Sequence, residues 1–257
     1  MITIKNETQI EKMRKAGALL HSVLEALRAE IQPGVTTMHL DRMAERLIRA
    51  GGAVPSFKGF QGFPYSICAS VDDQVVHGFS NGTPLREGQL LSIDCGCILD
   101  GWHSDSAFSL LVGGGSPEAQ KLIDVTEECF WIGAAQAVSG NRLGDISHAI
   151  QVHAEKHGYG VVRDLCGHGI GREMHEDPNI PNFGPPDRGV RLRPGMTLAI
   201  EPMITMGSWR VYVDRDEWTV RTQDGSLASH YEHTLLITEG DPEILSFPGA
   251  RITEALR

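Results

Sequence analysis

Hydrophobic residues recur every three or four positions in four segments of the chain, the spacing of one buried helix face. The first segment contains TQIE at Thr8–Glu11, which resembles a capping box, and continues to Ile31. The second ends at Gly51-Gly52. The third opens with Ser116-Pro117 as N-cap and first helical residue, and the fourth covers about 145–157. These patterns predict four helices.

Apolar stretches with the composition of strands lie between and after the helix pairs. The predicted strands cover 90–97, 102–112, 196–206, 209–213, 218–222 and 229–238. Helices and antiparallel strands that come in blocks, rather than in strict alternation, indicate an α+β fold.

Two pairs of segments resemble each other at nearly the same separation. Residues 33–52 align with 139–158 at an offset of 106, and REGQLLSID (86–94) aligns with RPGMTLAIE (193–201) at an offset of 107. Both members of the second pair end in an acid. We therefore predict a single domain of two pseudo-symmetric halves, about 1–112 and 113–257, each with an acid at the same strand position.

The segment LLSIDCGCILDGWHSDSAFSLLV (90–112) predicts a buried hairpin with Asp94 on one strand and Asp105 on the other. A two-residue loop at Asp100-Gly101 makes the acids diagonal neighbours on one face, whereas a loop centred on Leu99-Asp100 places them directly opposite. Two close carboxylates in apolar surroundings do not both stay ionised unaided, so they share a proton or hold a cation. The remaining alternative is that one acid faces water at a sheet edge.

Charge and cysteine content narrow the classes of function. With 23 basic and 33 acidic residues, the net charge is −10, which argues against a nucleic-acid binder because phosphate binding needs a basic face. The five cysteines fit neither a disulfide framework nor a Cys-x-x-Cys zinc site. No apolar run reaches the ~18–20 residues that span a bilayer, and the N-terminus lacks the apolar region of a signal peptide. We therefore expect a cytoplasmic protein.

Three more candidate ligands lie in the second half of the chain. Glu201 is the repeat partner of Asp94, Glu232 lies in an apolar-flanked strand, and His168 stands between glycines in CGHGIG. Together with Asp94 and Asp105 they bring four carboxylates and one imidazole, a charge that two divalent cations would balance. Oxygen-rich ligation without thiolate suits Mn, Fe, Co or Zn, and two such ions ~3.5–4 Å apart make a hydroxide nucleophile and polarise a carbonyl. The set predicts a dinuclear hydrolase.

Longer motifs surround these residues: SICASVDDQVVHG with His77, IDCGCILDGWHSDSA, CGHGIGREMHEDPNIPNFG with His168 and His175, LAIEPM, and HYEHTLLIT. Over nearly its whole length the chain resembles type I methionine aminopeptidases. The resemblance implies the pita-bread fold, a curved antiparallel sheet with two outer helix pairs in two pseudo-symmetric halves. The short interval from His168 to Glu201, and the absence of a preceding extension, are typical of the short bacterial form.

The resemblance also implies how the metals are held and what the enzyme does. Asp94 would chelate one ion, His168 and Glu201 would bind the other, and Asp105 and Glu232 would bridge both. The expected reaction is hydrolysis of the N-terminal methionine from nascent polypeptides with a small second residue, by a metal-bridged hydroxide that attacks the scissile carbonyl. The expected enzyme is a monomer that contacts the ribosome transiently.

Further residues receive roles by the same resemblance. Glu201 would accept the proton of the attacking water, His175 would contact the substrate carbonyl and stabilise the tetrahedral intermediate, and His77 would lie near the scissile nitrogen or the second residue. An apolar pocket with aromatic and sulfur-containing walls suits a thioether. The implied methionine pocket comprises Phe57, Phe60, Phe63, Cys68, Met174 and Trp218.

The sequence departs from the family pattern at several positions, which puts pocket shape and rate in doubt. These are Phe60 and Phe63 in place of tyrosines, Leu165 in place of an aromatic or methionine, Met174 in place of phenylalanine, and Gly96 in place of a small hydroxyl residue. Two alternatives stay open. One is an X-Pro aminopeptidase or dipeptidase of the same fold, and the other is a non-catalytic binding protein on this scaffold.

Overall fold

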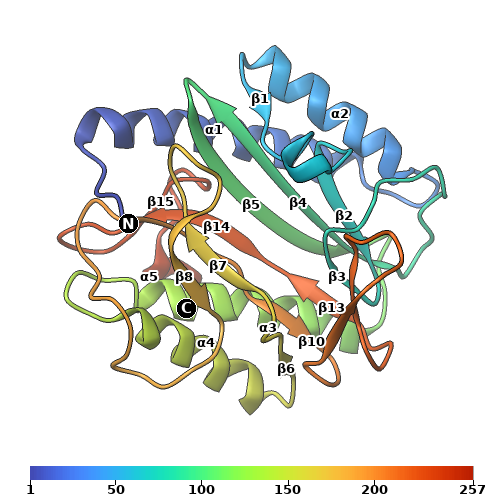
Figure 1. Ribbon diagram of the computed structural model, residues 1–257. Coiled ribbons are helices and arrows are strands. Elements are labelled where there is room, and N and C mark those ends of the chain that lie inside the picture. Colours follow the sequence, from blue (N-terminus) through green and yellow to red (C-terminus); the bar gives the residue numbers. More distant parts are fainter. Residues whose placement is uncertain (257) are drawn as a thin grey trace.

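A computed structural model describes residues 1–256, in which helices and antiparallel strands form one curved α+β layer structure (Figure 1). The four predicted helices are present, and a short fifth follows near the C-terminus. They are α1 Glu7–Glu30, α2 Thr37–Ala50, α3 Pro117–Ala135, α4 Leu143–Lys156 and α5 Ile252–Ala255.

A nine-stranded sheet forms the centre of the molecule, with strand order β1-β4-β5-β14-β9-β7-β8, while β2 pairs with β4 and β15 with β14. Two three-stranded sheets, β13-β10-β6 and β11-β12-β3, lie beside it. The strands are β1 Val54–Pro55, β2 Ile67–Val71, β3 Gln74–Val76, β4 Leu90–Leu99, β5 Trp102–Leu111, β6 Gly160–Val161, β7 Cys166–Gly169, β8 Glu176–Pro181, β9 Thr197–Ile200, β10 Met203–Thr205, β11 Val211–Val213, β12 Val220–Thr222, β13 Ala228–His230, β14 Glu232–Leu236 and β15 Glu243–Ile244.

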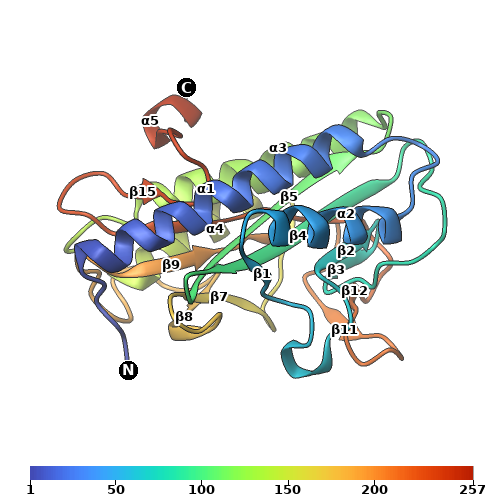
Figure 2. The ribbon, with the colours of Figure 1, turned by 90° about the horizontal axis from the view of Figure 1, so that it is seen from above.

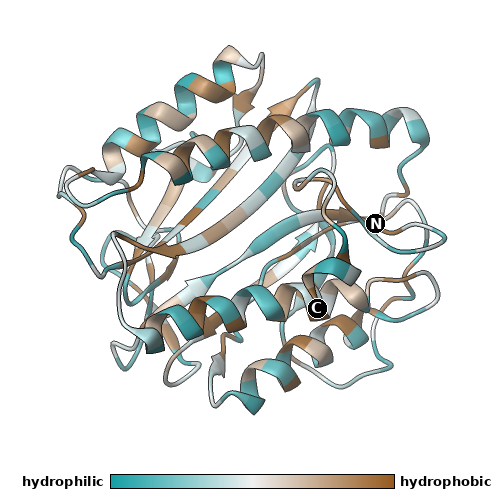
Figure 3. Cartoon of the chain, turned by 180° about the vertical axis from the view of Figure 1, so that it is seen from behind, coloured by the Kyte–Doolittle hydropathy of each residue, from teal (hydrophilic) through white to brown (hydrophobic). Residues whose placement is uncertain are grey.

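The helices cover one face of the central sheet. Figure 2 shows α1 and α3 on one side of the sheet, with β8, β11 and their loops on the other side. The helices are amphipathic, as the alternating colours of Figure 3 show, and their apolar sides form two core clusters with the sheet. Leu91 and Ile93 of β4 pack with α1 and α2, and Leu198 and Ile200 of β9 pack with α3. Alternation along a strand therefore leaves the residues between them to the opposite face.

Several predicted boundaries were wrong. The first helix is capped by Asn6, whose side chain accepts from the Gln9 N–H while the Gln9 side chain accepts from the Asn6 N–H, so the capping box lies two residues before Thr8. The fourth helix begins at Leu143 rather than near 145. The predicted strands 196–206 and 229–238 are each interrupted, into β9 and β10 and into β13 and β14.

The two aligned segments adopt the same local structure. Helices α2 and α4 begin and end at equivalent residues, and the preceding glycines have nearly equal dihedral angles, with φ 94° at Gly34 and 96° at Gly140. The Gly34 N–H donates to the Leu85 carbonyl at 2.8 Å, and the Gly140 N–H donates to the Leu192 carbonyl at 3.1 Å. These equivalences support the predicted pseudo-symmetry.

The hairpin of β4 and β5 turns through a two-residue loop. Leu99 pairs with Trp102, and both loop residues have positive φ, 51° at Asp100 and 75° at Gly101, as a type I′ turn requires. Of the two registers considered from the sequence, the structure has the one that makes the hairpin acids diagonal rather than directly opposite.

No helix within residues 1–256 is long and apolar enough to cross a membrane. All five cysteines are free.

Candidate metal centre

The predicted ligands project from one face of the central sheet, in two adjacent rows. In the first row, Asp94 of β4 pairs with Ala107 of β5, and Ala107 pairs with Glu232 of β14. In the second row, Asp105 of β5 pairs with Gly96 of β4. Side chains two residues apart on a strand share a face, so the three acids gather on the side of the sheet away from the helices.

The second row continues to His168. The Asp105 N–H donates to Thr234 Oγ1 at 3.0 Å, and that hydroxyl donates to the Asp105 carbonyl at 2.9 Å. Thr234 pairs with Ala199, which pairs with His168 of β7. The residues between the ligands are glycine, alanine and threonine, and their small size leaves space above the sheet for the carboxylates to converge.

Glu201 and Glu232 lie opposite each other where the pairing of two strands is interrupted. The pairing of β9 with β14 and the pairing of β10 with β13 share one register, which sets Glu201 directly opposite Glu232. Like charges at directly opposed positions destabilise a strand pair, and Pro202, after Glu201, has no N–H to donate. The ribbon that the sequence predicts as continuous is therefore interrupted where the two acids meet.

The electrostatic surroundings of the acids favour a cation. Burial raises the pKa of Asp94 to about 7. Burial, followed by the repulsion of neighbouring carboxylates, raises the pKa values of Asp105, Glu201 and Glu232 well above their usual range. Among the ion pairs of the described residues, the only nitrogen partners of these acids are two imidazoles. Four buried carboxylates without a lysine or arginine partner need another source of positive charge.

His168 presents one free ring nitrogen to this group. Its Nδ1 donates to the Gly169 carbonyl at 2.9 Å, and because a carbonyl only accepts, Nδ1 carries the proton. The Nε2 lone pair then faces Glu201 Oε1 at 3.7 Å. Burial, with a further contribution from His175, lowers the pKa of His168 to about 4, so the ring is neutral near pH 7. A neutral imidazole oriented by a backbone carbonyl is a typical metal ligand.

These residues fit a divalent metal ion. Asp94 Oδ1 and Glu232 Oε1 are buried with no hydrogen-bond partner in the described part of the chain, which is rare for buried oxygen atoms. Asp105, His168 and Glu232 each offer a ligand atom within 4.8 Å of the others. Carboxylate oxygens with one imidazole are a donor set for divalent first-row metals.

A cavity of about 190 Å³ is lined by the ligand rows on one side and by apolar residues on the other. All the site residues expected from the sequence line this cavity. They are Phe57, Phe60, Phe63, Cys68, His77, Asp94, Asp105, His168, Met174, His175, Glu201, Trp218 and Glu232.

The apolar wall is built from packed rings and sulfur atoms. The Phe63 and Trp218 ring centroids lie 5.1 Å apart, and the Phe60 and His175 centroids 5.4 Å apart. Cys68 and Met174 belong to the same buried cluster. Burial raises the pKa of the Cys68 thiol well above its usual value, so this residue is a wall of the cavity rather than a nucleophile.

His175 is held by the residue that follows it. Glu176 accepts from the Arg172 N–H at 2.8 Å and forms a buried ion pair with Lys5 Nζ at 2.7 Å. The His175 ring lies edge-on to His168, with 4.4 Å between centroids. Burial lowers the pKa of His175. The neutral ring is thus fixed beside the metal ligands by an anchor outside the cavity.

His77 occupies a strained backbone position on the opposite rim. Its φ is 60°, in the left-handed region that a residue with a side chain rarely adopts. Its ring lies edge-on to Trp218, and burial, with a contribution from His175, lowers its pKa to about 4. The strain indicates that the surrounding structure holds this imidazole in place.

Two residues of the site were missed from the sequence. Gln61 lines the cavity, and His230 places Nε2 3.7 Å from Glu232 Oε2 and 3.8 Å from Glu201 Oε2. Gln61 lies in the short 3-10 helix Phe60–Gly62, where the surrounding glycines gave no periodic pattern. His230 looked like any strand histidine, because only the pairing register brings it beside both glutamates.

The structure shows the surroundings of two residues that depart from the family pattern, Leu165 and Gly96. Leu165 does not line the cavity but packs against a separate cluster that includes Val162 and Val220. A Cβ at Gly96 would lie 2.9 Å from Ser56 Cβ and 3.0 Å from Phe57 Cε1. The missing side chain therefore allows the segment with Phe57 to approach the hairpin.

Comparison with known proteins places this geometry among metallopeptidases. The model of the family described as metallopeptidase family M24 matches residues 11–239. A methionine aminopeptidase of Clostridium acetobutylicum is 54% identical over 247 residues, which are 96% of this chain and 99% of the relative.

Solved structures of related enzymes have the same fold as this chain. The crystal structure of methionine aminopeptidase from Rickettsia prowazekii superposes with a TM-score of 0.95 at 40% identity, over 96% of this chain and 100% of the other. The prolidase from Pyrococcus furiosus superposes with a TM-score of 0.77 at 22% identity, over 96% of this chain and 66% of the other, and shows the shared fold alone. The pita-bread fold expected from the sequence is confirmed.

Proposed function

The chain belongs to metallopeptidase family M24, and we propose that it removes the N-terminal methionine from peptides whose second residue is small. The observation that carries this proposal is the convergence of four carboxylates and one imidazole nitrogen on a cavity with an aromatic, sulfur-containing wall. The name of the similar enzymes from Clostridium acetobutylicum and Rickettsia prowazekii supports methionine as the residue removed.

We assign two divalent ions to the centre, of cobalt, manganese, iron or zinc. When bound, such ions supply a hydroxide nucleophile at neutral pH and polarise the scissile carbonyl. The chain contributes rigid placement, because four of the five ligands stand on paired strands and Glu201 directly follows β9. The proposed ligands are Asp94, Asp105, His168, Glu201 and Glu232.

Three side chains carry the proton and charge movements in this proposal. The Glu201 carboxylate accepts the proton of the attacking water and delivers it to the leaving amine. His175 donates a hydrogen bond to the substrate carbonyl oxygen and to the oxyanion that forms from it. His77, which also lines the cavity, lies near the scissile nitrogen or the second residue of the substrate in this proposal. Both histidines have lowered pKa values, so both rings are neutral near pH 7.

The apolar wall is the proposed seat of the methionine side chain. Phe63, Trp218 and Phe57 offer ring edges and faces to a thioether, which gains from contact between sulfur and aromatic rings. Met174 and Cys68 complete the wall with polarizable atoms. A methionine seated there brings its carbonyl toward the carboxylates, because both walls belong to the same cavity.

The X-Pro alternative is not favoured. The prolidase likeness extends to the fold alone, and the enzymes called methionine aminopeptidase are far more similar to this chain. A non-catalytic role is not favoured either, because all five ligands converge. We further propose that the substrates are nascent chains met during transient ribosome contact, and that the enzyme works as a cytoplasmic monomer.

Activity on two peptides after metal exchange tests the proposal. The protein is stripped with a chelator, reconstituted with one metal at a time, and assayed on Met-Ala-Ser and on Ala-Pro peptides. We expect no turnover without metal and preferential cleavage of Met-Ala-Ser with at least one metal. Preference for the proline peptide, or turnover of Met-Ala-Ser that chelation does not reduce, would overturn the proposal.

A further inference from the structure

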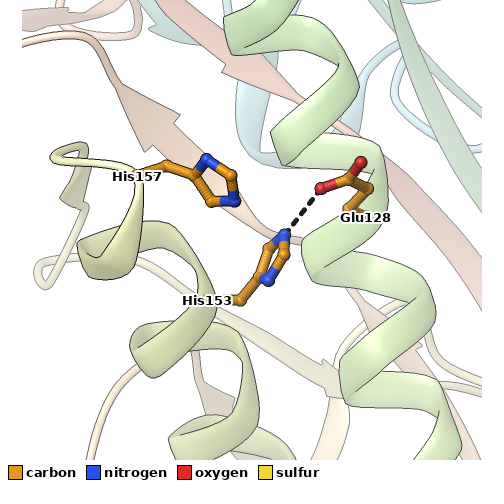
Figure 4. Close-up of side chains that lie close together, drawn as sticks. All are labelled: Glu128, His153 and His157. Carbon is orange, nitrogen blue, oxygen red and sulfur yellow. Dashed lines mark hydrogen bonds and ion pairs between the residues drawn. The ribbon is translucent and has the colours of Figure 1, made fainter.

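A second group of metal-binding side chains lies on the outer helices, away from the cavity. Figure 4 shows Glu128 of α3, His153 of α4 and His157, which directly follows α4, turned toward one another. Each offers a ligand atom within 4.8 Å of the others. None of the three lines the cavity of the metal centre.

The geometry of this group is that of a pre-arranged three-donor site. His153 and His157 are four residues apart at the end of one helix, so their rings lie on one face, with centroids 4.8 Å apart. His153 Nε2 lies 2.7 Å from Glu128 Oε2 of the neighbouring helix. The His153 side chain is only 16% exposed, so its orientation is restrained by packing.

The charge around the group also favours a cation. The C-terminal end of a helix carries a partial negative charge, and this end of α4 holds His153 in its last turn and His157 directly after it. Burial first, and His153 second, lower the pKa of His157, which keeps its ring neutral and able to donate a lone pair near pH 7. The charges of Lys121 and Lys156 nearby oppose a bound ion. Glu128 supplies the compensating anion.

We propose that Glu128, His153 and His157 form a separate surface site for zinc or a similar late first-row divalent ion. Two imidazoles and one carboxylate leave further coordination positions for water, as in open zinc sites. An ion held there links α3 to the last turn of α4. Metal analysis of the enzyme then counts one ion more than the centre in the cavity holds.

Zinc content measures the proposal directly. Untagged wild-type protein and the double variant His153→Gln with His157→Gln are dialysed against zinc alone, and bound zinc per chain is measured by mass spectrometry. We expect one zinc fewer in the double variant. The matched control is His39→Gln, since His39 hydrogen-bonds Glu30 at 3.0 Å but belongs to no group of three possible metal ligands within residues 1–256.

Equal zinc content in wild type and double variant overturns the proposal, and so does an equal loss in the His39 control. Circular dichroism establishes that the substituted helix is intact. The measurement does not depend on catalysis, so a failure here leaves the proposed function untouched.

A different observation concerns His230, two residues before Glu232. His230 is 1% exposed, and its Nε2 has no hydrogen-bond partner within residues 1–256. Its Nε2 lies 3.7 Å from Glu232 Oε2 and 3.8 Å from Glu201 Oε2. Both distances exceed a normal N–H···O hydrogen-bond length by about 1 Å or less. His230 is not among the residues that line the cavity.

We infer that His230 is a positioning residue for the metal ligands and donates from Nε2–H to the two opposed glutamates. This inference rests on the proposed metal centre. Partners that hydrogen-bond to ligands commonly change metal affinity about 10–100-fold. A donor shared by Glu201 and Glu232 would hold both carboxylates at the point where the strand ladder gives them no backbone support.

Cobalt titration followed by visible absorption tests the role. His230→Leu should bind cobalt about 10–100-fold more weakly than wild type, while His230→Gln, which keeps an N–H donor, should stay within a few-fold. The control is His233→Gln, an equally buried histidine that packs toward α3 instead.

Wild-type affinity in His230→Leu overturns the inference. Equal losses in the leucine and glutamine variants, with altered cobalt bands, also overturn it, because they would make His230 a direct ligand. If wild-type protein itself binds no cobalt, the proposed function fails instead.

Discussion

The two strand pairs that carry the acids solve the same electrostatic problem differently. In the β4–β5 hairpin, Asp94 pairs with Ala107 and Asp105 with Gly96, so the acids are diagonal and the ladder is unbroken. In the ribbon formed by β9, β10, β13 and β14, Glu201 lies directly opposite Glu232 and the ladder opens. A strand pair can therefore hold two carboxylates at diagonal positions with its backbone hydrogen bonds intact. When the carboxylates are directly opposite, strand pairing depends on a cation between them.

The largest expected effect comes from an acid of the intact hairpin. Asp105→Asn should lower activity on Met-Ala-Ser more than about 100-fold, because even hydrogen-bond partners of ligands commonly cost 10–100-fold. Steady-state kinetics at saturating metal measure it. The matched control is Asp100→Asn at the tip of the same hairpin, where asparagine tolerates the positive φ. Activity near wild type in Asp105→Asn would rule out its assignment as a bridging ligand.

Metal removal should change the hydrogen-exchange rates of the two strand pairs by different factors. At metal concentrations about 100 times the dissociation constant, binding stabilises by about 2.7 kcal/mol, a factor of about 100 in protection. We expect chelation to accelerate exchange in β10, β13 and β14 by up to this factor and to leave the β4–β5 ladder nearly unchanged. Equal acceleration in both regions would remove the distinction between them.

The stability of the metal-free protein should fall as pH rises from about 6.5 to 8. A carboxyl group whose pKa is raised by folding keeps its proton in the folded state after the unfolded chain has lost it, so stability decreases with pH in that interval. The buried histidines have lowered pKa values and contribute the opposite slope only below about 6.5, their ordinary value. We expect the melting temperature of the metal-free protein to fall by several degrees over this interval, at about 2–4 °C for each kcal/mol lost from the free energy of unfolding.

Saturating metal supplies the control for this pH dependence. Bound ions keep the carboxylates ionised in the folded protein, so the decline between pH 6.5 and 8 should disappear. A metal-free protein whose melting temperature is constant or rises over the same interval contradicts the raised pKa values of the acids.

The smallest effect contrasts two neutralising substitutions in metal-free protein at pH 8. Glu232→Gln removes the direct opposition and should raise the melting temperature by about 2–4 °C, which corresponds to about 1 kcal/mol. Asp94→Asn relieves only a diagonal contact and should raise it less. If Asp94→Asn stabilises as much as Glu232→Gln, the position of an acid along the ladder does not matter.

The hairpin was predictable because its information is local. Alternating apolar residues, an Asp-Gly turn and two acids at fixed distances from that turn determine which face they share. The interruption at Glu201 was not predictable, since LAIEPMIT and ASHYEHTLL each read as an unbroken strand. Only their mutual register, a long-range property, brings Glu201 against Glu232 and His230 beside both.

Short elements around the cavity also escaped prediction. Strand β7 has the sequence CGHG and β8 has EDPNIP, and neither has a length or composition that distinguishes a strand from a loop. They form because the central sheet offers them a paired edge. The resemblance to a known family supplied the site residues in these segments, where periodicity supplied nothing.

The buried ion pair between Lys5 and Glu176 has a practical consequence for anyone who handles this protein. Thr3 and Lys5 both bind the carboxylate that follows His175, so the first residues of the chain support the wall of the cavity. A purification tag or truncation at the N-terminus would disturb the contacts of Glu176 and, through them, the position of His175. Affinity tags therefore belong at the C-terminus.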